Sequence, residues 1–346
     1  MKRYVSIFSI LILLFIAVMT GAAQETLTPG ETVEGEYDGD PVVYTVDAEQ
    51  GQLLIVSMES EEIDAYVAFT EDGEEIAADD DSGIDYNALL AFVAQEDGPY
   101  TLEAGASYFG DDAGAFALRV NVVDPVAVSI DEPIVLEAEE GGSGQLYATL
   151  EATAGTVVNI SAKSTGEDDV DISLVGVDAE EIDEDSNDGP GDSPLLRRVV
   201  LPEDGIYLIK VTPSYSDDML SESVELLVEA TEQLYLSETP QDLILGDGEG
   251  QTGTEVYTVD VEAGKTYRFI FTIQYLPDEE GGIQLELLDT ARFFDPELEA
   301  QHATRVAWDF IPNASGTVRL DVHPSFFTTD LQRIEYTAAM EVIDAE

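Results

Sequence analysis

The fold of this chain is decided by the stretch Val43-Tyr44-Thr45-Val46-Asp47-Ala48-Glu49-Gln50-Gly51, because similar stretches occur twice more. The second runs from Leu146-Tyr147-Ala148-Thr149 to Ala154-Gly155, and the third is Val256-Tyr257-Thr258-Val259-Asp260-Val261-Glu262-Ala263-Gly264. Each copy is an apolar run with a Tyr at its second position and a Gly eight or nine residues after its start. Internal self-similarity is the signature of repeated structural units. We therefore interpret the three stretches as the opening strands of three related modules.

A second landmark follows in each copy at a similar distance. The sequence Asp97-Gly98-Pro99-Tyr100 corresponds to Asp204-Gly205-Ile206-Tyr207, and more weakly to Ser315-Gly316-Thr317-Val318. Asp-Gly between two apolar runs predicts a hairpin, because Gly tolerates the positive φ that tight turns require. The repeated pair of landmarks indicates that each copy folds in the same way.

The copies also close alike, with strands of alternating polarity at 116–122, 224–229 and 336–342. Alternation puts one face on a core and the other in water. We find no convincing amphipathic helix after the N-terminal segment, so the pattern predicts an all-β chain of three tandem jelly-roll or β-sandwich domains. The predicted domains are 24–124, 125–231 and 232–346.

The first 23 residues have the pattern of an export signal. Lys2 and Arg3 precede an apolar run from Val5 to Met19, and small residues follow up to Ala23. We expect cleavage after Ala23 and a secreted or cell-surface protein, with an uncleaved membrane anchor as the alternative. No later segment approaches spanning length, and the chain has no Cys for disulfides.

The charge balance is extreme, with 74 acidic against 13 basic residues and a formal net charge of −61. Such a field repels nucleic-acid phosphates and anionic lipid headgroups. It favours divalent cations or basic surfaces as partners. The alternative interpretation is solubility or adaptation to high salt, which screens the self-repulsion.

The chain resembles the bacterial pre-peptidase C-terminal domain family, a jelly-roll sandwich related to collagen-binding-type domains. The resemblance rests on short motifs in the first two copies: Gly30-Glu31-Thr32-Val33-Glu34-Gly35, Asp64-Ala65-Tyr66-Val67-Ala68-Phe69, Asp79-Asp80-Asp81-Ser82-Gly83, Asp169-Val170-Asp171-Ile172-Ser173-Leu174 and Pro202-Glu203-Asp204-Gly205-Ile206-Tyr207. The third copy lacks the Asp-x-Asp step and the acidic loop. The resemblance implies a binding, targeting or secretion-related module without an active site.

Calcium is the one ion with local support in the sequence. Ca²⁺ takes six to eight oxygen ligands, commonly from carboxylates and carbonyls clustered on a loop. The candidate ligands are Asp64, Asp79, Asp80, Asp81, Asp85 and Asn87 in the first copy, and Asp169, Asp171, Asp183, Asp185, Asn187 and Asp188 in the second. The alternative is that these loops are simply solvated.

Catalytic patterns are scarce. Cys is absent, the only His residues are His302 and His323, and no Gly-x-Ser-x-Gly elbow occurs. A carboxylate pair of the glycosidase type cannot be recognised among so many acids. We expect a non-enzyme that binds an extracellular polymer, glycan or protein or acts as a spacer. The alternatives are an accessory subunit of a secreted peptidase and a carboxylate-based glycan hydrolase.

The aromatic residues are predicted to serve the cores. Tyr44, Tyr147 and Tyr257 share one position in the copies, which favours a common core role over a ligand contact. For Trp308, core packing is preferred over a carbohydrate-binding platform.

Overall fold

The computed structural model describes the chain from residue 25 onward, with interruptions. The described ranges are 25–107, 113–138, 144–187, 189, 193–214, 220–245, 255–275, 283–289, 292–294, 305–324 and 334–343. Within them the chain forms strands and one short 3-10 turn, η1 (Ile84–Tyr86). The predicted export signal, 1–23, lies outside the described residues. In the part that the structure covers, no helix is long and apolar enough to cross a membrane.

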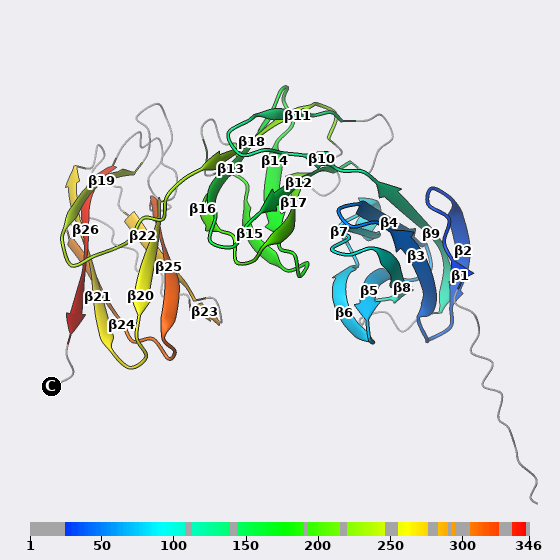
Figure 1. Cartoon of the computed structure of the whole chain (residues 1–346), viewed down its shortest axis with the longest axis horizontal. Helices are drawn as coiled ribbons and strands as arrows, with labels where there is room; N and C mark the ends of the chain where they lie inside the picture. The colour runs from blue at the N-terminus through cyan, green and yellow to red at the C-terminus, as the bar shows by residue number, and fades with distance from the viewer. Residues whose placement is uncertain are drawn as a thin grey trace, which may run out of the picture.

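Sandwich 1 (25–123) pairs two sheets with the strand orders β1-β3-β8-β5-β6 and β2-β9-β4-β7 (Figure 1). Its strands are β1 (Glu25–Thr26), β2 (Thr32–Tyr37), β3 (Val42–Ala48), β4 (Leu53–Glu59), β5 (Ala65–Glu71), β6 (Glu74–Asp79), β7 (Ala88–Val93), β8 (Gly98–Ala106) and β9 (Gly114–Val123). Apart from β1, which joins β3 in parallel, all of these pairs are antiparallel.

Sandwich 2 (126–230) repeats this topology, with the orders β10-β12-β17-β14-β15 and β11-β18-β13-β16. Its strands are β10 (Val126–Ala127), β11 (Ile134–Leu136), β12 (Leu146–Ala152), β13 (Val157–Ser164), β14 (Val170–Val175), β15 (Glu181–Asp185), β16 (Leu195–Val200), β17 (Gly205–Pro213) and β18 (Val224–Ala230). Position by position, β12 corresponds to β3 and β17 to β8.

Sandwich 3 (235–343) has the orders β20-β25-β22-β23 and β19-β26-β21-β24. A parallel bridge from Tyr235 to Thr258 stands where β1 and β10 lie in the other sandwiches. Its strands are β19 (Gln241–Leu245), β20 (Glu255–Val261), β21 (Thr266–Tyr275), β22 (Ile283–Asp289), β23 (Arg292–Phe294), β24 (Arg305–Phe310), β25 (Gly316–Pro324) and β26 (Ile334–Ile343).

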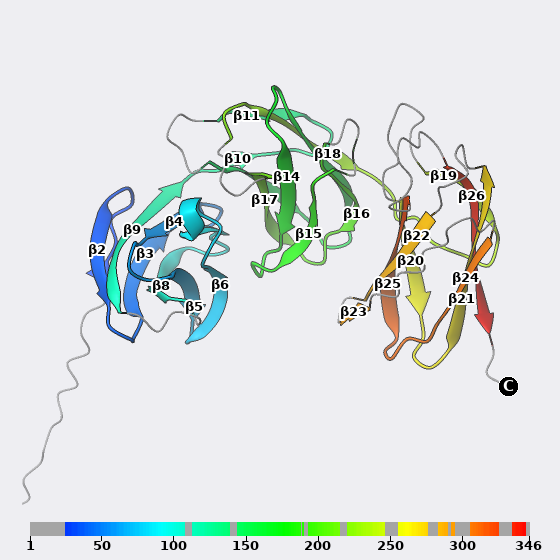
Figure 2. The same cartoon turned by 180° about the vertical axis from the view of Figure 1, so that it is seen from behind.

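These sheets confirm the predicted fold class, an all-β chain of tandem sandwiches. Figure 2, from behind, shows the three sandwiches following one another along the molecule. The exact domain boundaries stay predictions, although β9 ends at Val123 and β18 at Ala230, next to the predicted limits.

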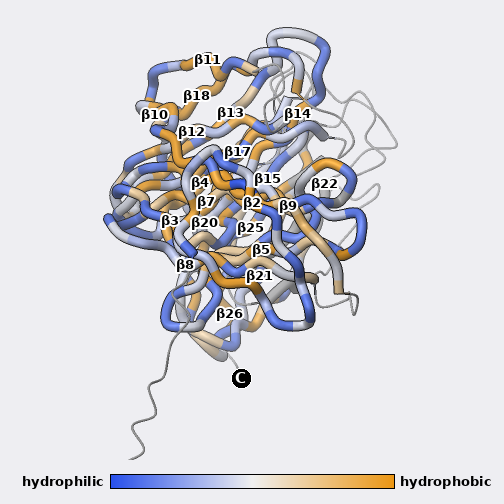
Figure 3. Tube along the Cα trace, turned by 90° about the vertical axis from the view of Figure 1, so that its right-hand side faces the viewer, coloured by the Kyte–Doolittle hydropathy of each residue, from blue (hydrophilic) through white to orange (hydrophobic). Residues whose placement is uncertain are grey.

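Each sandwich encloses its own hydrophobic core between its two sheets. Val56 and Phe69 are fully buried in sandwich 1, as are Ile160 in sandwich 2 and Phe269 in sandwich 3. In Figure 3 the hydrophobic segments follow the strands, while many connecting turns are hydrophilic. Trp308 packs against Phe269 with ring centroids 5.8 Å apart, which confirms its predicted core role.

The opening Gly of each copy forms the predicted turn. Gly51, Gly155 and Gly264 have φ angles of 85°, 80° and 76°, where a side chain would be strained. The second landmark closes the same turn from the other side. The side chains of Asp97, Asp204 and Ser315 accept hydrogen bonds from the N–H groups of Gln50, Ala154 and Ala263 at 2.8, 2.8 and 2.9 Å.

The predicted common role of the three tyrosines is wrong for Tyr147. Tyr44 and Tyr257 point into the cores of their sandwiches, but the core position of β12 is taken by Ala148. Tyr147 precedes its Gly by one residue more than the other two tyrosines do. Successive strand residues face opposite sides of the sheet, so this shift of one residue turns the ring outward. Tyr147 is buried instead between sandwiches 1 and 2.

Two junctions join the sandwiches. At junction 1–2, Leu53 of β4 and Val93 of β7 pack against Tyr147, Val175 and Leu208 of sandwich 2. At junction 2–3, charged side chains make the contact. Arg198 of β16 pairs with Glu255 of β20 at 2.7 Å, and Arg319 of β25 pairs with Asp183 of β15 at 2.7 Å.

Candidate functional site

The two acidic segments predicted to bind calcium form loops of the same kind, one in sandwich 1 and one in sandwich 2. Asp79 accepts a hydrogen bond from the N–H of Leu89 at 2.8 Å, and Asp185 accepts one from the N–H of Leu195 at 2.7 Å. The spacing from Asp to Leu is ten residues in both. Asp79 Oδ1 also accepts the N–H of Ser82 at 3.2 Å. The carboxylates therefore close their own loops.

A Gly holds each of these loops together. The N–H of Gly83 donates to the carbonyl of Asn87 at 2.7 Å, and that of Gly189 donates to the carbonyl of Ser193 at 2.8 Å. A Cβ at either Gly would lie 2.5 or 2.6 Å from the carbonyl oxygen it faces, which no larger residue allows. The Gly is thus needed for close approach of the backbone.

Some of the other candidate ligands also contact the protein itself. Asp80 accepts a hydrogen bond from Ser107 Oγ at 3.0 Å, and Asn87 Oδ1 accepts the N–H of Ser60 at 2.9 Å. Asp171 accepts one from Ser214 Oγ at 2.5 Å. The remaining side chains, Asp64, Asp81, Asp85, Asp169 and Asn187, are exposed, and Asp188 lies outside the described residues.

Asp183 is placed differently from the sequence interpretation, which grouped it with Asp185 and Asn187. It pairs with Arg319 of sandwich 3 across junction 2–3. In the described ranges, no group of three or more acidic or His side chains is arranged to hold a metal ion. The calcium site therefore stays a prediction of the sequence.

Asp79 and Glu181 are two described acids whose pKa is raised. Burial raises the pKa of Asp79, although its hydrogen bonds to Ser82 and Leu89 oppose this. Burial also raises the pKa of Glu181, and the neighbouring Glu184 and Asp183 raise it further. Asp79 lies on β6 of sandwich 1 and Glu181 on β15 of sandwich 2, and the charge of Lys210 acts to lower the pKa of both. Of the two His residues, His302 is outside the described residues and His323 lies on β25.

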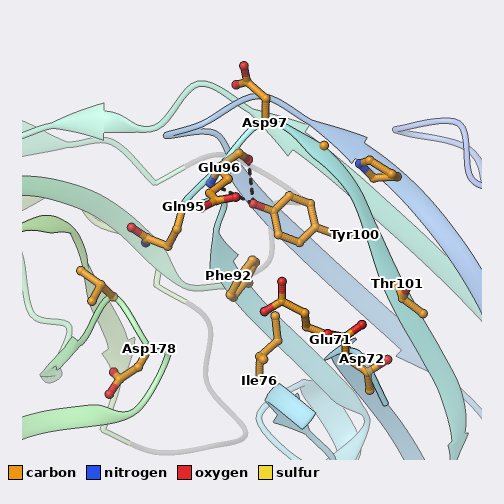
Figure 4. A pocket seen from close by; sticks show the side chains of 14 residues that line it. Glu71, Asp72, Ile76, Phe92, Gln95, Glu96, Asp97, Tyr100, Thr101 and Asp178 are labelled. Carbon is orange, nitrogen blue, oxygen red and sulfur yellow. Dashed lines mark hydrogen bonds between the residues drawn. The ribbon is translucent and has the colours of Figure 1, made fainter. Parts of the chain in front are cut away.

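A cleft of about 470 Å³ lies where sandwich 1 meets the β14–β15 turn of sandwich 2 (Figure 4). Its residues come from the β5–β6 turn, from β6, β7 and β8, from the segment before β8, and from the β14–β15 turn. They are Thr70, Glu71, Asp72, Ile76, Phe92, Gln95, Glu96, Asp97, Gly98, Pro99, Tyr100, Thr101, Val177 and Asp178.

Aromatic rings held by the core of sandwich 1 line the middle of the cleft. Phe92 packs on Phe69 at 5.0 Å and on Tyr100 at 5.4 Å between ring centroids. The Tyr100 hydroxyl donates to the carbonyl of Glu96 at 2.8 Å and accepts the N–H of Glu96 at 3.2 Å. These contacts fix the Tyr100 ring, so the platform is formed before any ligand arrives.

Carboxylates surround this platform. Five of the lining residues are acidic and none is basic: Glu71, Asp72, Glu96, Asp97 and Asp178. Burial raises the pKa of Tyr100, and the charges of Glu96 and Glu71 raise it further. Figure 4 shows Glu71 close to Phe92 and Tyr100, with Asp178 on the facing wall. The cleft is therefore apolar in its middle and negative at its rim.

The second wall is attached to sandwich 1 by specific contacts. Gln95 Nε2 donates to the carbonyl of Ile206 at 3.0 Å, beside the apolar contacts of junction 1–2. Ala179, in the β14–β15 turn, packs against the core of sandwich 1, and within sandwich 2 Val177 lies against Gly205. Sequence reasoning missed this cleft because its two walls come from different modules, and no motif within one copy records their contact.

No protein-family model matches the chain, and no curated protein is similar to it in sequence. Solved structures with some similarity include the CUB1-EGF-CUB2 domain of human MASP-1/3, at 8% identity and a TM-score of 0.18, over 60% of this chain and 99% of that one. The structure of Sulfolobus turreted icosahedral virus matches at 12% identity and a TM-score of 0.21, over 92% of this chain and 91% of that one. A triple jelly-roll turret protein of an archaeal virus matches at 14% identity and a TM-score of 0.21, over 88% of this chain and 82% of that one.

Proposed function

We propose that the chain is an exported, non-catalytic array of jelly-roll modules of the pre-peptidase C-terminal type, which binds a polymer, glycan or protein outside the cell. One observation carries the proposal. The same topology occurs three times, and at each junction the corresponding edge strand, β7 or β16, lies against the next sandwich, β7 at β17 and β16 at β20. Stacked modules of this kind hold binding surfaces at fixed positions.

The cleft at junction 1–2 is the binding site that we assign to this array. Ligand sites occur preferentially as recesses at domain interfaces, with an apolar lining and a few convergent polar groups. The cleft has this composition, with Phe92 and Tyr100 in its middle and Glu71 and Asp178 at its rim. The Gln95–Ile206 contact fixes one wall relative to the other.

Retention of a partner from the producing cells tests the binding role. Tagged mature chain, beginning at Gln24, is incubated with envelope and culture medium with and without Ca²⁺. We expect a wall polymer, a glycan or a protein to be retained. The variant Glu71→Arg, in the cleft, should lose this partner, whereas Glu34→Arg, on exposed β2, makes the same charge change and should keep it. A retained peptidase would favour an accessory role, and retention of nothing would contradict the proposal.

Export is tested separately by N-terminal sequencing of the protein recovered from the culture medium. The proposal expects Gln24 as the first residue. Intact chain that stays inside the cell would contradict it.

Calcium stays a prediction of the sequence. Calorimetric titration of chelator-stripped protein with millimolar Ca²⁺ checks it, through binding heat and a rise in melting temperature. An inert titration would leave the loop hydrogen bonds of Asp79 and Asp185 as the whole role of these acids.

A further inference from the structure

We infer that the cleft at junction 1–2 binds an alkylammonium group, as carried by the lysine side chains of a basic polypeptide. The inference deepens the proposed function and rests on it, since it names the chemical class of the ligand for the same cleft. It depends on the charge of the rim, the rings in the middle and the spacing of the carboxylates.

No basic side chain lines the cleft, and Lys210 of sandwich 2 lies near Asp79 and Glu181, which are not lining residues. All five charged lining residues are acidic. Arg119 is the only basic residue between Gln24 and Asp124, and it lies on β9, where it faces Thr32 and Ser57 of the second sheet. Carboxylates gathered without a counter-charge repel each other, and a bound cation relieves that repulsion. The cleft therefore selects a positive ligand.

The middle of the cleft suits an organic cation. Tyr100 offers a partly exposed ring, Phe92 packs against it with 6% exposure, and Ile76 and Val177 add aliphatic surface. An ammonium group near an aromatic face is attracted by the ring quadrupole, and its methylene stem gains from apolar contact. A lysine side chain offers both parts in one ligand.

The spacing of the acids favours such a ligand over a metal ion. Among the described residues, no three acidic side chains converge closely enough to hold a metal. The lining acids instead come from the β5–β6 turn, the segment before β8 and the β14–β15 turn, on two sides of a cleft of about 470 Å³. Dispersed charges around this volume match a ligand with a long stem.

The corresponding place in sandwich 2 is closed. Tyr207 makes the same contact as Tyr100, donating to the carbonyl of Glu203 at 2.6 Å, but its ring has 0% exposure. In sandwich 3 the equivalent position is Val318, 5% exposed. Neither offers an aromatic surface to a ligand, so the inference expects one such site per chain.

Titration calorimetry with tetralysine in 0.15 M NaCl tests the inference on the mature chain. We expect saturable binding to one site. The double variant Glu71→Gln/Asp178→Asn should weaken binding about tenfold. The matched variant Glu34→Gln/Glu36→Gln removes two charges from exposed β2, at the far edge of the sheet, and should change binding less than twofold.

Further arms separate the chemical contributions. Fully side-chain-acetylated tetralysine keeps the stems without the charge and should not bind. Tyr100→Phe should retain binding and Tyr100→Leu should lose it, with the melting temperature of each variant recorded as a check of folding. Competition by spermidine would support the same chemistry with a free polyamine as the source.

Equal weakening in the two double variants would overturn the inference, because it would show diffuse attraction to an acidic surface. Binding of the acetylated peptide would overturn it as well. Failure of the inference differs from failure of the proposed function. If tetralysine does not bind while an envelope partner is still lost in Glu71→Arg, the cleft binds something of another class and the array function stands.

Discussion

Junctions 1–2 and 2–3 share one corresponding strand, β7 in the first and β16 in the second, but they differ in chemistry. At junction 1–2, apolar side chains of β4 and β7 meet Tyr147, Val175 and Leu208. At junction 2–3, Arg198 and Arg319 bridge to Glu255 and Asp183. The same edge strand of the preceding sandwich thus takes part in both junctions, whereas its residues and its partner strand differ.

The difference is instructive in a chain with so few cations. An apolar contact is non-directional. When one of its side chains is truncated, the free energy of unfolding falls in proportion to the apolar area that becomes exposed. A charged contact depends on each partner, because a carboxylate left behind in a desolvated place has nothing to offset its charge. Arg319 is the extreme case, since it pairs with Asp183 and also with Asp321, whose side chain is 5% exposed.

The largest expected effect is that of Arg319→Ala. Burial alone would lower the pKa of Arg319, but the charges of Asp321 and Asp183 and their hydrogen bonds raise it, which shows how strongly the cation is held. Removing it takes the guanidinium away from both carboxylates, and we expect a loss of about 3 kcal/mol from the stability of sandwich 3.

Fluorescence of Trp308, the only Trp in the chain, reports unfolding of sandwich 3 in urea. The matched control is Arg268→Ala, which breaks an exposed pair with Asp309 in the same sandwich and should shift the midpoint little. Similar shifts in the two variants would contradict a special role for junction 2–3.

Tyr147→Ala probes the apolar junction. Tyr147 is 9% exposed, and its hydroxyl donates to Gln145, whose amide reaches the carbonyl of Ser82 in sandwich 1 at 2.9 Å. We expect a loss of about 2 kcal/mol, less than for a closed core because water can enter the gap. Hydrogen exchange should quicken in β7 and β12, while the Trp308 midpoint stays unchanged. A shift of that midpoint would show that the two junctions are coupled.

Tyr147 also shows where sequence reasoning reached its limit. The glycine turns at Gly51, Gly155 and Gly264 were predictable, because positive φ and strand alternation leave local signals. The side of the sheet on which Tyr147 lies was not predicted. A shift of one residue relative to Gly155 moves the side chain to the opposite side, although the sequence pattern of the strand looks the same. The partner of Arg319 lies 136 residues away in another module, and no local rule connects them.

The same limit applies to the candidate sites. The acidic loops were found by composition, but the hydrogen bond that the N–H of Leu89 donates to Asp79 depends on backbone geometry that composition does not contain. Aligning the loops on Gly83 and Gly189 would have paired Asp79 with Asp185 and left Asp183 outside the loop. The cleft could not be predicted from the sequence, because two of its lining residues, Val177 and Asp178, come from sandwich 2 and reach it only when the two sandwiches are in contact.

Salt should separate the two junctions further. Raising NaCl from 0.05 to 1 M screens charge pairs and also relieves the self-repulsion of a chain with a net charge of −61, so absolute stability is a poor measure. The difference between wild type and Arg319→Ala should shrink by about 1 kcal/mol, while the difference for Tyr147→Ala stays constant. Equal shrinkage of the two differences would contradict the ionic assignment of junction 2–3.

The smallest effect concerns Glu181, on the strand that carries Asp183. Burial raises the pKa of Glu181, and repulsion from Glu184 and Asp183 adds to it, while Lys210 opposes it. A raised pKa in the folded state means that the ionised form is disfavoured there. Its contribution to stability is therefore present at low pH and is lost as the pH rises through the folded pKa.

Glu181→Gln removes this penalty, and we expect it to stabilise sandwich 2 at pH 7 by less than about 1 kcal/mol, because solvent screens a partly exposed group. The gain should vanish below about pH 4, where Glu is protonated in the unfolded chain too. Urea unfolding followed by hydrogen exchange of β14 and β15 at pH 7 and pH 4 measures both values. Destabilisation at pH 7 would mean that the contact of Glu181 with Ser173 outweighs the repulsion, and that β15 needs its full negative charge to hold Arg319.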